Sequence, residues 1–429
     1  MAKRGFVMDK FVIEGGTQLK GTVPASGSKN AALPIMVAAL LVSGKTTLRH
    51  VPQLRDVSTL SRLLEMMGAR IERRDDRLMI DTRDLVSVEA PYDLVKTMRA
   101  SIYVLGPLLA RARRARVSLP GGCAWGPRPV DLHLKGMEAL GAKITIDEGY
   151  VVAECPRGLR GAEIHLDIPS VGATGNILMA AVGAKGRTVI RNAAREPEIP
   201  ALADALSAMG ANITGGGTSE ITIEGDHPLK SSVVDNIPDR IEAGTFLVGA
   251  AMTHGDVTVT RCSPTHLSAL MAKLREAGAE VTSEADWVRV RGPEHPKAVN
   301  VTTDFYPGFP TDLQAQMMAL ASMSDGTSIV TEQIYRDRFT HVAELNRLGA
   351  HITLDNNVAV IEGRQHLSGA HVMATDLRAS AALILAGLAA RGETHMSRVY
   401  HIDRGYEHIE AKLAGLGAVV RREQEALVV

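Results

Sequence analysis

The chain has 429 residues, which is too many for one compact core, so its length favours two domains. Its 48 Lys and Arg residues balance 48 Asp and Glu residues, and this zero net charge excludes a general attraction to nucleic acid or to a membrane surface. Aromatic residues make up only 3% of the chain, so the core must consist mainly of aliphatic side chains.

The N-terminal residues 1–16 contain no continuous apolar run typical of a secretory signal. The longest apolar runs are about a dozen residues, which is too short to span a membrane. The three cysteines, Cys123, Cys155 and Cys262, are far apart and form no Cys-x-x-Cys pair, so neither a disulfide framework nor a zinc cluster is expected. These features predict a cytoplasmic protein.

The first predicted element is a strand over 11–20, and an apolar helix follows it, ends at a turn and leads into another strand. The helix, turn and strand recur six times along the chain. Because the helices are apolar on almost every face, we expect them to be buried. The predicted helices are 31–42, 100–110, 173–183, 243–253, 313–324 and 379–390. The strands that follow them are 46–51, 116–119, 188–191, 257–260, 328–331 and 394–398.

A second helix follows each strand, and its charged face predicts an outer position. Each of these helices ends in Gly-Ala, where the glycine suits a left-handed C-cap. The glycines recur about 70 residues apart, at Gly68, Gly141, Gly210, Gly278, Gly349 and Gly417. Strands come next, some of them hairpins, over 71–80, 144–153, 213–224, 281–290, 352–362 and 419–429.

Six βαβαββ-type units with helices inside and sheets around them predict an α/β (α+β) fold of two inside-out barrels, with three units in each. We expect one domain over 29–236, which carries the loop of Cys123. The other is expected over 1–28 plus 237–429, because the opening strand most simply completes the last three units. A cleft between the two domains is then the expected ligand site.

Three of the six buried helices begin with a cation, namely Lys29, Arg99 and Arg378. A cation beside the positive end of a helix dipole is unfavourable, so it needs a reason. One explanation is a surface side chain paired with a nearby carboxylate, which is common. Three equivalent cations together favour an anion site instead, because helix N-termini and cations jointly bind phosphate or carboxylate.

The other three helices begin near Ser170, Glu242 and Asp312. An ordinary N-cap explains Ser170, although the small residues after it would also let backbone N–H groups approach a ligand. An acid in the first helical turn, such as Glu242, needs no functional explanation. Asp312 follows a stiff Pro-containing segment at 307–310 and is therefore a candidate general base.

Cys123 lies among Gly and Pro residues with Arg128 nearby, so we expect a loop with a mobile, exposed and partly activated thiol. Cys155 and Cys262 are interpreted as small buried residues. The segment 39–46 resembles a Walker A motif but lacks its first glycine and runs from a helix into a strand. The basic run 111–116 is interpreted as a solvated helix end. The 14 histidines show no metal-ligand spacing, so no metal site is predicted.

Seven segments of the chain resemble the bacterial UDP-N-acetylglucosamine enolpyruvyl transferases, and the resemblance runs nearly from end to end. The segments are 28–34, 96–101, 121–132, 192–198, 309–312, 374–380 and 401–405. The fold of that family, two inside-out α/β barrels of three units each, agrees with the fold predicted from the repeat.

The resemblance implies transfer of the enolpyruvyl group of phosphoenolpyruvate to the 3-hydroxyl of UDP-N-acetylglucosamine, with release of phosphate, as the first committed step of peptidoglycan synthesis. It implies that Cys123 protonates the methylene carbon, that Asp312 takes the hydroxyl proton, and that Lys29 and Arg404 also take part in catalysis. The residues implied for phosphoenolpyruvate are Lys29, Asn30, Arg128, Arg378 and Arg404. Those implied for UDP-N-acetylglucosamine are Asn30, Arg99, Arg128, Pro129, Val130, Asp131, Leu132, Ile168, Pro169, Ser170, Val171, Asp312 and Ile334.

The resemblance implies no metal and no organic cofactor, and its partners are two small molecules rather than nucleic acid or membrane. The loop of Cys123 would close as a lid, and its thiol would be alkylated by fosfomycin. Two alternatives stay open. A shikimate-phosphate enolpyruvyl transferase shares the fold and the donor, although the 121–132 loop argues against it. A non-catalytic sugar-nucleotide regulator is the other, although the joint presence of Lys29, Cys123, Asp312 and Arg404 argues against that.

Overall fold

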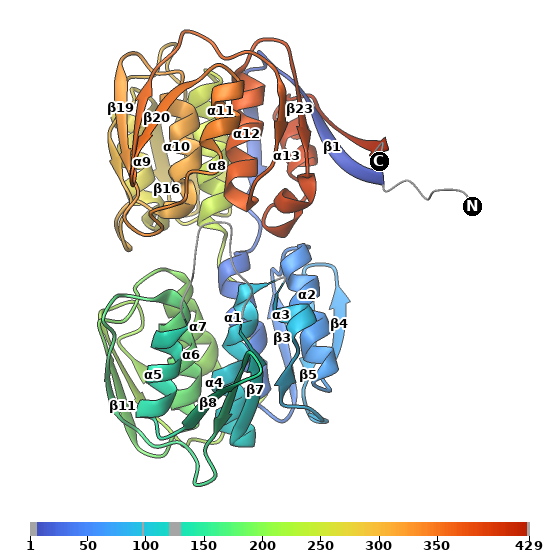
Figure 1. The fold of residues 1–429 in the computed structure, drawn as a ribbon, viewed down its shortest axis with the longest axis vertical. Helices are drawn as coiled ribbons and strands as arrows, with labels where there is room; N and C mark the ends of the chain where they lie inside the picture. Colours follow the sequence, from blue (N-terminus) through green and yellow to red (C-terminus); the bar gives the residue numbers. More distant parts are fainter. Residues whose placement is uncertain (1–6, 97, 120–129, 427–429) are drawn as a thin grey trace, which may run out of the picture. The chain divides into compact units, whose positions relative to one another are not determined.

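The computed structural model describes residues 7–96, 98–119 and 130–426, and its backbone contacts divide the chain into two units. Gly27–Ile237 form one, called here the middle unit, while Met1–Ser26 together with Pro238–Val429 form the other, called the terminal unit. Figure 1 shows both units as helices accompanied by twisted sheets. The N-terminal segment therefore belongs with the second half of the chain.

The middle unit is built from three copies of one arrangement of helices and strands. Its helices are α1 (Lys29–Ala38), η1 (Ala39–Leu41), α2 (Arg55–Met66), α3 (Tyr92–Val95), η2 (Arg99–Val104), α4 (Leu105–Ala112), α5 (Asp131–Ala139), α6 (Val171–Val182) and α7 (Glu198–Ala208). Its strands are β3 (Lys45–Arg49), β4 (Arg70–Arg74), β5 (Arg77–Asp81), β6 (Glu89–Ala90), β7 (Arg114–Ser118), β8 (Lys143–Asp147), β9 (Tyr150–Glu154), β10 (Glu163–His165), β11 (Arg187–Arg191), β12 (Asn212–Thr214), β13 (Glu220–Glu224) and β14 (Val233–Asp235).

The terminal unit repeats the same arrangement three times. Its helices are α8 (Arg240–Met252), η3 (Pro264–Leu267), α9 (Ser268–Glu276), η4 (Thr311–Leu313), α10 (Gln314–Ala321), α11 (Val342–Arg347), α12 (Leu377–Ala389), η5 (Val399–Arg404) and α13 (Ile409–Gly415). Its strands are β1 (Val7–Glu14), β2 (Lys20–Pro24), β15 (Asp256–Thr260), β16 (Glu280–Glu284), β17 (Trp287–Arg291), β18 (Val301–Thr302), β19 (Thr327–Thr331), β20 (His351–Asp355), β21 (Val358–Glu362), β22 (His371–Met373), β23 (Glu393–Ser397) and β24 (Val420–Ala426).

Every described sheet has four strands, and all six follow one pattern. In the sheet β10-β11-β13-β12, the first pair is parallel and the next two pairs are antiparallel, with Ile190 opposite Ile221. The parallel edge strand comes from an earlier or later part of the chain, as when β14 pairs with β3 at the other end of the middle unit. One supersecondary unit is thus used six times.

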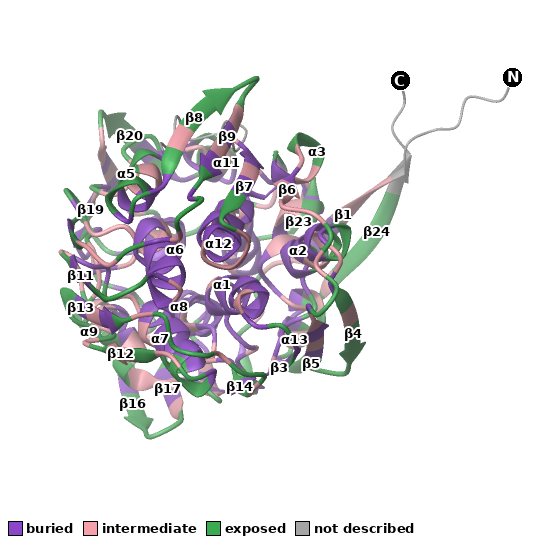
Figure 2. Cartoon of the chain, turned by 90° about the horizontal axis from the view of Figure 1, so that it is seen from below, coloured by how far each residue is buried: buried purple, intermediate pink, exposed green. Residues whose placement is uncertain are grey.

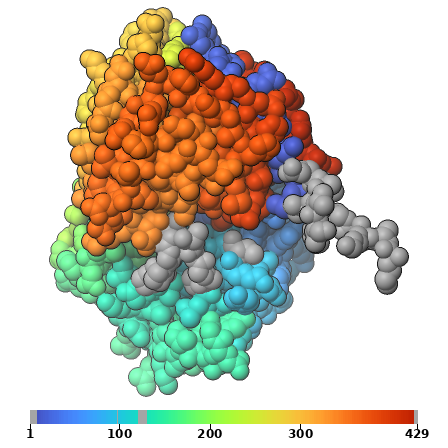
Figure 3. Space-filling model, turned by 45° about the horizontal axis from the view of Figure 1, so that its top comes forward, coloured from blue at the N-terminus to red at the C-terminus, as the bar shows by residue number. Residues whose placement is uncertain are grey.

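The strand predicted over 11–20 is wrong in its bounds, because two strands of two different sheets occupy this region. β1 lies between β23 and β24, whereas β2 pairs with β15. The first of these strands ends just before Gly15. A Cβ atom at this position would lie 2.0 Å from the carbonyl oxygen of Ala390. Figure 3 shows blue N-terminal residues among red C-terminal ones, as this pairing requires.

The hairpin considered over 419–429 is likewise a single described strand, β24, whose antiparallel neighbour is β1. In the other five repeats this strand comes from the repeat's own hairpin. In the last repeat the N-terminal segment supplies it. This pairing leaves the last unit without a need for a second strand of its own.

The first helix of each of the six repeats is buried, and the sheets face outward. From Ala173 to Val182 all residues of α6 are buried, and from Ile241 to Met252 all residues of α8 are. Figure 2 shows α1, α6, α8 and α12 as buried helices with exposed strands at the periphery. Strands such as β13 alternate between exposed and buried positions, so one face packs on the helices. The predicted inside-out arrangement is confirmed.

All six glycines of the repeated Gly-Ala phrase have positive φ angles, from 93° at Gly349 to 108° at Gly210. A residue with a Cβ atom is strained in this conformation, so glycine ends these helices. The basic run is less solvated than predicted, because Arg111 donates hydrogen bonds to the carbonyl oxygens of Leu40, Val42 and Thr82. No helix in the described part of the chain combines the length and apolar character needed to cross a membrane.

Candidate active site

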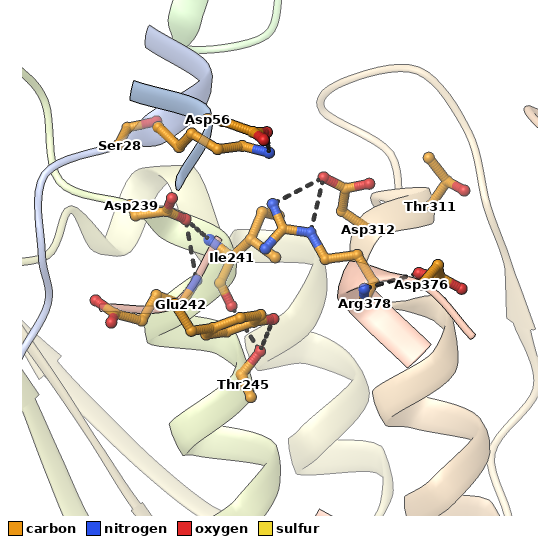
Figure 4. Close-up of polar contacts among 12 residues, drawn as sticks. Ser28, Asp56, Asp239, Ile241, Glu242, Thr245, Thr311, Asp312, Asp376 and Arg378 are labelled. Carbon is orange, nitrogen blue, oxygen red and sulfur yellow. Dashed lines mark hydrogen bonds and ion pairs between the residues drawn. The ribbon is translucent and has the colours of Figure 1, made fainter. Parts of the chain in front are cut away.

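Asp312 lies in η4, the short turn that leads into the buried helix α10. Its Oδ1 atom accepts a hydrogen bond from Nη1 of Arg338 at 2.8 Å. Its Oδ2 atom accepts two from Arg378, at 3.2 Å from Nε and 3.1 Å from Nη2 (Figure 4). A quarter of the Asp312 side chain remains exposed. Two guanidinium groups thus fix the direction of a carboxylate that solvent can still reach.

Arg378 is the second residue of the buried helix α12 and is itself only 2% exposed. Burial lowers the pKa of its guanidinium. The negative charge of Asp312, together with Tyr406 and Asp239, raises this pKa by more, so the net shift is upward. This cation is therefore permanently charged. Its carboxylate partner is Asp312, and the anion site expected at this helix start stays a prediction.

A buried polar cluster lies behind Arg378. Its Cζ atom is 5.4 Å from the centroid of the Tyr406 ring. The Tyr406 hydroxyl is 2.9 Å from the hydroxyl of Thr245, and Nε2 of Gln316 donates to both oxygens. Because these side chains are buried, the hydrogen bonds limit the positions that Tyr406 and Arg378 can take.

A buried carboxylate, Glu332, follows strand β19 and is joined to this site through Thr311 and Arg338. It accepts hydrogen bonds from the hydroxyls of Thr303 and Thr311, both at 2.9 Å. The hydroxyl of Thr311 in turn accepts a hydrogen bond from Nη1 of Arg338 at 2.9 Å. Glu332 also accepts the backbone N–H of Ile334 at 2.8 Å, so it fixes the backbone of a predicted nucleotide-binding residue.

Helix α8 begins at Arg240, and Glu242 lies in its first turn, as the sequence analysis expected. Asp239 is the N-cap residue, and it accepts the N–H groups of Ile241 and Glu242 (Figure 4). Glu242 is 1% exposed and forms an ion pair with Lys412 at 2.7 Å. Burial raises the pKa of Glu242, and Lys412 opposes this shift. Arg404, the remaining predicted catalytic cation of this unit, is the last residue of η5 and is partly exposed.

Lys29 is the first residue of α1 in the middle unit, directly after the N-cap Ser28. It is 7% exposed, and its Nζ atom donates to Oδ2 of Asp56 at 3.1 Å. Asp56 is 4% exposed and lies in the first turn of α2. The ion pair is therefore buried rather than a surface pair. Asn30 follows in the helix and is partly exposed.

Arg99 begins η2 and lies near His133 of α5. His133 is 4% exposed, and burial together with the positive charge of Arg99 lowers its pKa to about 3. Its Nδ1 atom is 3.0 Å from Nδ2 of Asn176, which also donates to the carbonyl of Ile102. A neutral imidazole and an amide thus join η2, α5 and α6.

The predicted nucleotide-binding residues within 130–132 and 168–171 lie at the starts of two helices, α5 and α6. Ser170 caps α6 by accepting the N–H of Ala173, and the hydroxyl of Tyr103 donates to the carbonyl of Val171. Ile168 is 54% exposed, which leaves it accessible to a ligand. The remaining residues are the partly exposed Pro169, the buried Val130, and Asp131 and Leu132 in the first turn of α5.

Cys123, Arg128 and Pro129 lie outside the described residues. The two other cysteines are buried, as expected. Burial raises the pKa of the Cys155 thiol, and it raises that of Cys262 to about 11. Neither thiol is therefore ionised near neutral pH, so neither is suited to act as a nucleophile.

The side chains of these clusters that the sequence analysis did not single out include Asp56, His133, Glu332 and Arg338. Each is polar or charged and at most 5% exposed. A sequence signal exists for Glu332, an acid directly after an alternating strand. The others have none, because their partners come from separate elements. Within the described residues, no group of three or more His, Cys, Asp or Glu side chains is placed to hold a metal ion.

The chemistry of the terminal-unit cluster is that of a fixed carboxylate acceptor flanked by two cations. A carboxylate held in one orientation can accept a proton from a hydroxyl group, and fixed guanidinium groups can stabilise anionic oxygens. The middle unit offers helix N-termini with neutral caps together with Lys29 and Arg99, which is an arrangement suited to anions.

Comparison with known proteins connects the chain to a family. The family model described as EPSP synthase (3-phosphoshikimate 1-carboxyvinyltransferase) matches residues 13–413. A UDP-N-acetylglucosamine 1-carboxyvinyltransferase from Trichlorobacter lovleyi is 55% identical over 418 residues, which cover 97% of this chain and 100% of that protein. The protein of the same name from Myxococcus xanthus is 56% identical over 420 residues, with the same coverage.

Solved structures agree with this result. The enolpyruvyl transferase NikO from Streptomyces tendae superimposes with a TM-score of 0.86 at 25% identity, over 97% of this chain and 99% of that one. EPSP synthase from Acinetobacter baumannii gives a TM-score of 0.76 at 19% identity, over 97% and 100%, and supports the fold alone. The resemblance inferred from the seven segments is confirmed. The chain therefore belongs to the EPSP synthase family, among the proteins named UDP-N-acetylglucosamine 1-carboxyvinyltransferase.

Proposed function

We propose that the protein transfers the enolpyruvyl group of phosphoenolpyruvate to the 3-hydroxyl of UDP-N-acetylglucosamine and releases phosphate. The observation that carries this proposal is identity of 55–56% over 97% of the chain to relatives that bear the name of this activity. The reaction is the first committed step of peptidoglycan synthesis, and we place it in the cytoplasm. The enzyme is a transferase whose partners are these two small molecules.

In this proposal Asp312 is the base for the sugar hydroxyl. The hydroxyl oxygen bonds to C2 of phosphoenolpyruvate, its proton passes to Asp312, and the methylene carbon takes a proton from the thiol of Cys123. Loss of phosphate and of a proton from the new methyl group then restores the double bond in the product. The hydrogen bonds of Arg338 and Arg378 support this role, because they hold both carboxylate oxygens in fixed directions.

The donor carries a phosphate and a carboxylate, and we assign its recognition to Lys29, Asn30, Arg128, Arg378 and Arg404. Support comes from the burial of two of these cations, since a cation with a low exposed area attracts anions more strongly than one in water. Lys29 and Arg378 each already contact a carboxylate, Asp56 and Asp312 respectively. A bound donor would compete with these carboxylates or share the cations with them.

The sugar nucleotide is assigned to the residues at the helix starts of the middle unit, with Asn30, Asp312 and Ile334. Ser170 and Val171 support this assignment, because they lie at the N-terminus of α6, where backbone N–H groups favour anions. Recognition would then draw on residues of the two predicted domains, 29–236 and 1–28 plus 237–429. No cofactor or metal is part of this proposal.

The deciding experiment measures phosphate released from phosphoenolpyruvate by the purified protein with UDP-N-acetylglucosamine, with shikimate 3-phosphate or with no acceptor. We expect release only with the sugar nucleotide. Release with shikimate 3-phosphate alone would assign the other acceptor of this family. Binding of the nucleotide without any release would favour the regulator that the sequence analysis left open.

Inactivation by fosfomycin tests the role of Cys123 separately. Saturating fosfomycin should abolish phosphate release, and the Cys123→Ala variant should neither turn over nor take up the inhibitor. The buried thiols of Cys155 and Cys262 serve as internal controls, because mass spectrometry of peptides should find them unmodified. Full activity after saturating fosfomycin would contradict the assignment of Cys123.

A further inference from the structure

Glu332 is a buried carboxylate that no step of the proposed reaction uses. It directly follows strand β19 and is 0% exposed. Its Oε1 atom accepts hydrogen bonds from the hydroxyl of Thr303 and from the N–H groups of Ile334 and Tyr335, at 2.9, 2.8 and 2.9 Å. Its Oε2 atom accepts the hydroxyl of Thr311 at 2.9 Å. Four donors from three segments thus meet on one side chain.

Glu332 is the acceptor in all four of these contacts. Two backbone N–H groups can only donate, and the hydroxyl of Thr311 must donate to Glu332 because Arg338 donates to its oxygen. Ion pairs within the described residues do not include Glu332, so the four hydrogen bonds compensate for its removal from water. Burying a carboxylate is costly. A side chain kept there at such a cost points to a need for the arrangement it imposes.

The two oxygens of Glu332 hold two different parts of the candidate site. Oε2 reaches Asp312 through Thr311 and Arg338, because Nη1 of Arg338 donates both to Thr311 and to Oδ1 of Asp312. Oε1 holds the turn at 333–335, which carries Ile334. The backbone of Gln333 is tied to the same cluster, because its N–H donates to Thr303.

We propose that Glu332 is a positioning residue that couples the turn of Ile334 to the carboxylate of Asp312. The inference rests on the proposed function, in which Ile334 contacts the nucleotide and Asp312 accepts the proton of its sugar hydroxyl. Glu332 touches neither substrate. It fixes the position of Asp312 relative to the turn of Ile334. A nucleotide bound at that turn then places its sugar hydroxyl next to Asp312.

The Glu332→Gln variant keeps the shape of the side chain and breaks the hydrogen-bond polarity. If the amide oxygen faces Ile334 and Tyr335, its NH2 group faces the hydroxyl of Thr311, which must then give up its present donor role. If the amide is turned around, the NH2 group faces two backbone N–H donors. We expect the KM for UDP-N-acetylglucosamine to rise and kcat to fall, each by about 10- to 100-fold, with the KM for phosphoenolpyruvate within about twofold.

The Thr311→Val variant cuts only one of the two connections. It removes the hydroxyl that joins Oε2 to Arg338 and leaves the hydrogen bonds to the turn in place. We expect kcat to fall about tenfold while the KM for UDP-N-acetylglucosamine stays within about twofold, because only the base is displaced. This variant also decides the question if Glu332→Gln does not fold.

Glu344→Gln is the matched control. Glu344 is a carboxylate of the same unit on α11, and it also accepts a backbone N–H, that of Met373, at 3.0 Å. In this variant kcat and the KM for UDP-N-acetylglucosamine should both stay within about twofold of wild type. Thermal unfolding of all variants separates loss of folded protein from displacement of the base.

The outcomes are distinct. The two different splits between KM and kcat in Glu332→Gln and Thr311→Val support the coupling. Wild-type kinetic constants in both variants, or losses that only match a loss of folded protein, overturn it while leaving the proposed function intact. Wild-type protein that releases no phosphate with UDP-N-acetylglucosamine overturns the proposed function, and this inference falls with it.

Discussion

The two units differ in the charge of the residues at the start of their central helices. In the terminal unit an aspartate stands at each start, with Asp239 before α8, Asp312 before α10 and Asp376 before α12. In the middle unit Ser28 and Ser170 cap α1 and α6. The third start of that unit, η2, begins with Arg99.

The difference concerns the positive end of the helix dipole. An aspartate compensates it within the protein, whereas a serine satisfies one N–H group and leaves the partial charge for another anion. The middle unit is thus suited to bind external anions. The terminal unit supplies its own anions and uses buried guanidinium groups to hold one of them in place.

Asp312 is the exception within its own unit. Asp239 and Asp376 each accept two backbone N–H groups at the helix start, as ordinary caps do. The carboxylate of Asp312 is instead held by the side chains of Arg338 and Arg378. Three acids at equivalent places therefore have two different roles.

The largest effect is expected from Asp312→Asn. Removal of the proposed base should lower kcat by about 10²- to 10⁴-fold, because general-base catalysis contributes factors of this size. Phosphate release at saturating concentrations of both substrates measures this loss. Asp337→Asn, at an exposed position of the same unit, is the control and should keep wild-type kcat. A value of kcat within tenfold of wild type would make Asp312 a structural acid like Asp239 and Asp376.

The next largest effect compares two buried ion pairs, one in each unit. Lys29→Met leaves Asp56 buried without this cation, and Lys412→Met does the same to Glu242. We expect each variant to lose about 3–5 kcal/mol in the free energy of unfolding, which urea titration measures. Only Lys29→Met should also weaken binding of phosphoenolpyruvate, because Lys412 has no assigned substrate.

A second substitution separates the two effects of Lys29→Met. Adding Asp56→Asn should restore most of the stability, because a neutral amide is less costly to bury than a carboxylate that has lost the charge of Lys29. It should not restore binding of phosphoenolpyruvate. Recovery of both properties would show that Lys29 serves the fold alone.

Each unit also contains a buried histidine whose pKa is lowered. Burial, with a smaller effect of Arg99, lowers the pKa of His133 to about 3. In the terminal unit burial and Arg338 lower that of His341 to about 4, against the opposing effect of Asp376. An unfolded histidine has a pKa of about 6.5. Below that pH the unfolded chain binds a proton that the folded protein does not, so acid destabilises the fold.

The pH dependence should therefore be shallower in His133→Gln. Above pH 6.5 this histidine has no effect on the pH dependence, and below it wild-type stability should fall by up to about 1.4 kcal/mol per pH unit from this group. Between pH 6.5 and 5 the variant should retain about 2 kcal/mol that wild type loses. Urea titrations at several pH values measure the slope. Equal slopes would mean that His133 has the same pKa in the folded protein as in the unfolded chain.

The sequence predicted the helices and most strands because their signals are local. Apolar runs, turn glycines and alternating strands recur in each unit, and the positive φ angle of Gly349 follows from its own neighbourhood. The pairings of charged residues were not predictable in this way. Arg338 is 26 residues from Asp312, and Asp56 is 27 from Lys29, so only the fold brings the partners together. The loop of Cys123 stays a prediction.

The smallest effect is expected from exchanging the two kinds of helix cap. Asp376→Ser replaces the carboxylate with a hydroxyl, which can still accept a hydrogen bond but carries no charge. It should lower the free energy of unfolding by about 0.3–1 kcal/mol. Ser170→Asp adds a charge beside the start of α6 and should raise stability by a similar amount. The same change should raise the KM for UDP-N-acetylglucosamine, because the new carboxylate repels the anionic nucleotide. If Ser170→Asp left that KM unchanged, the uncompensated helix start of the middle unit would not be what attracts the substrate.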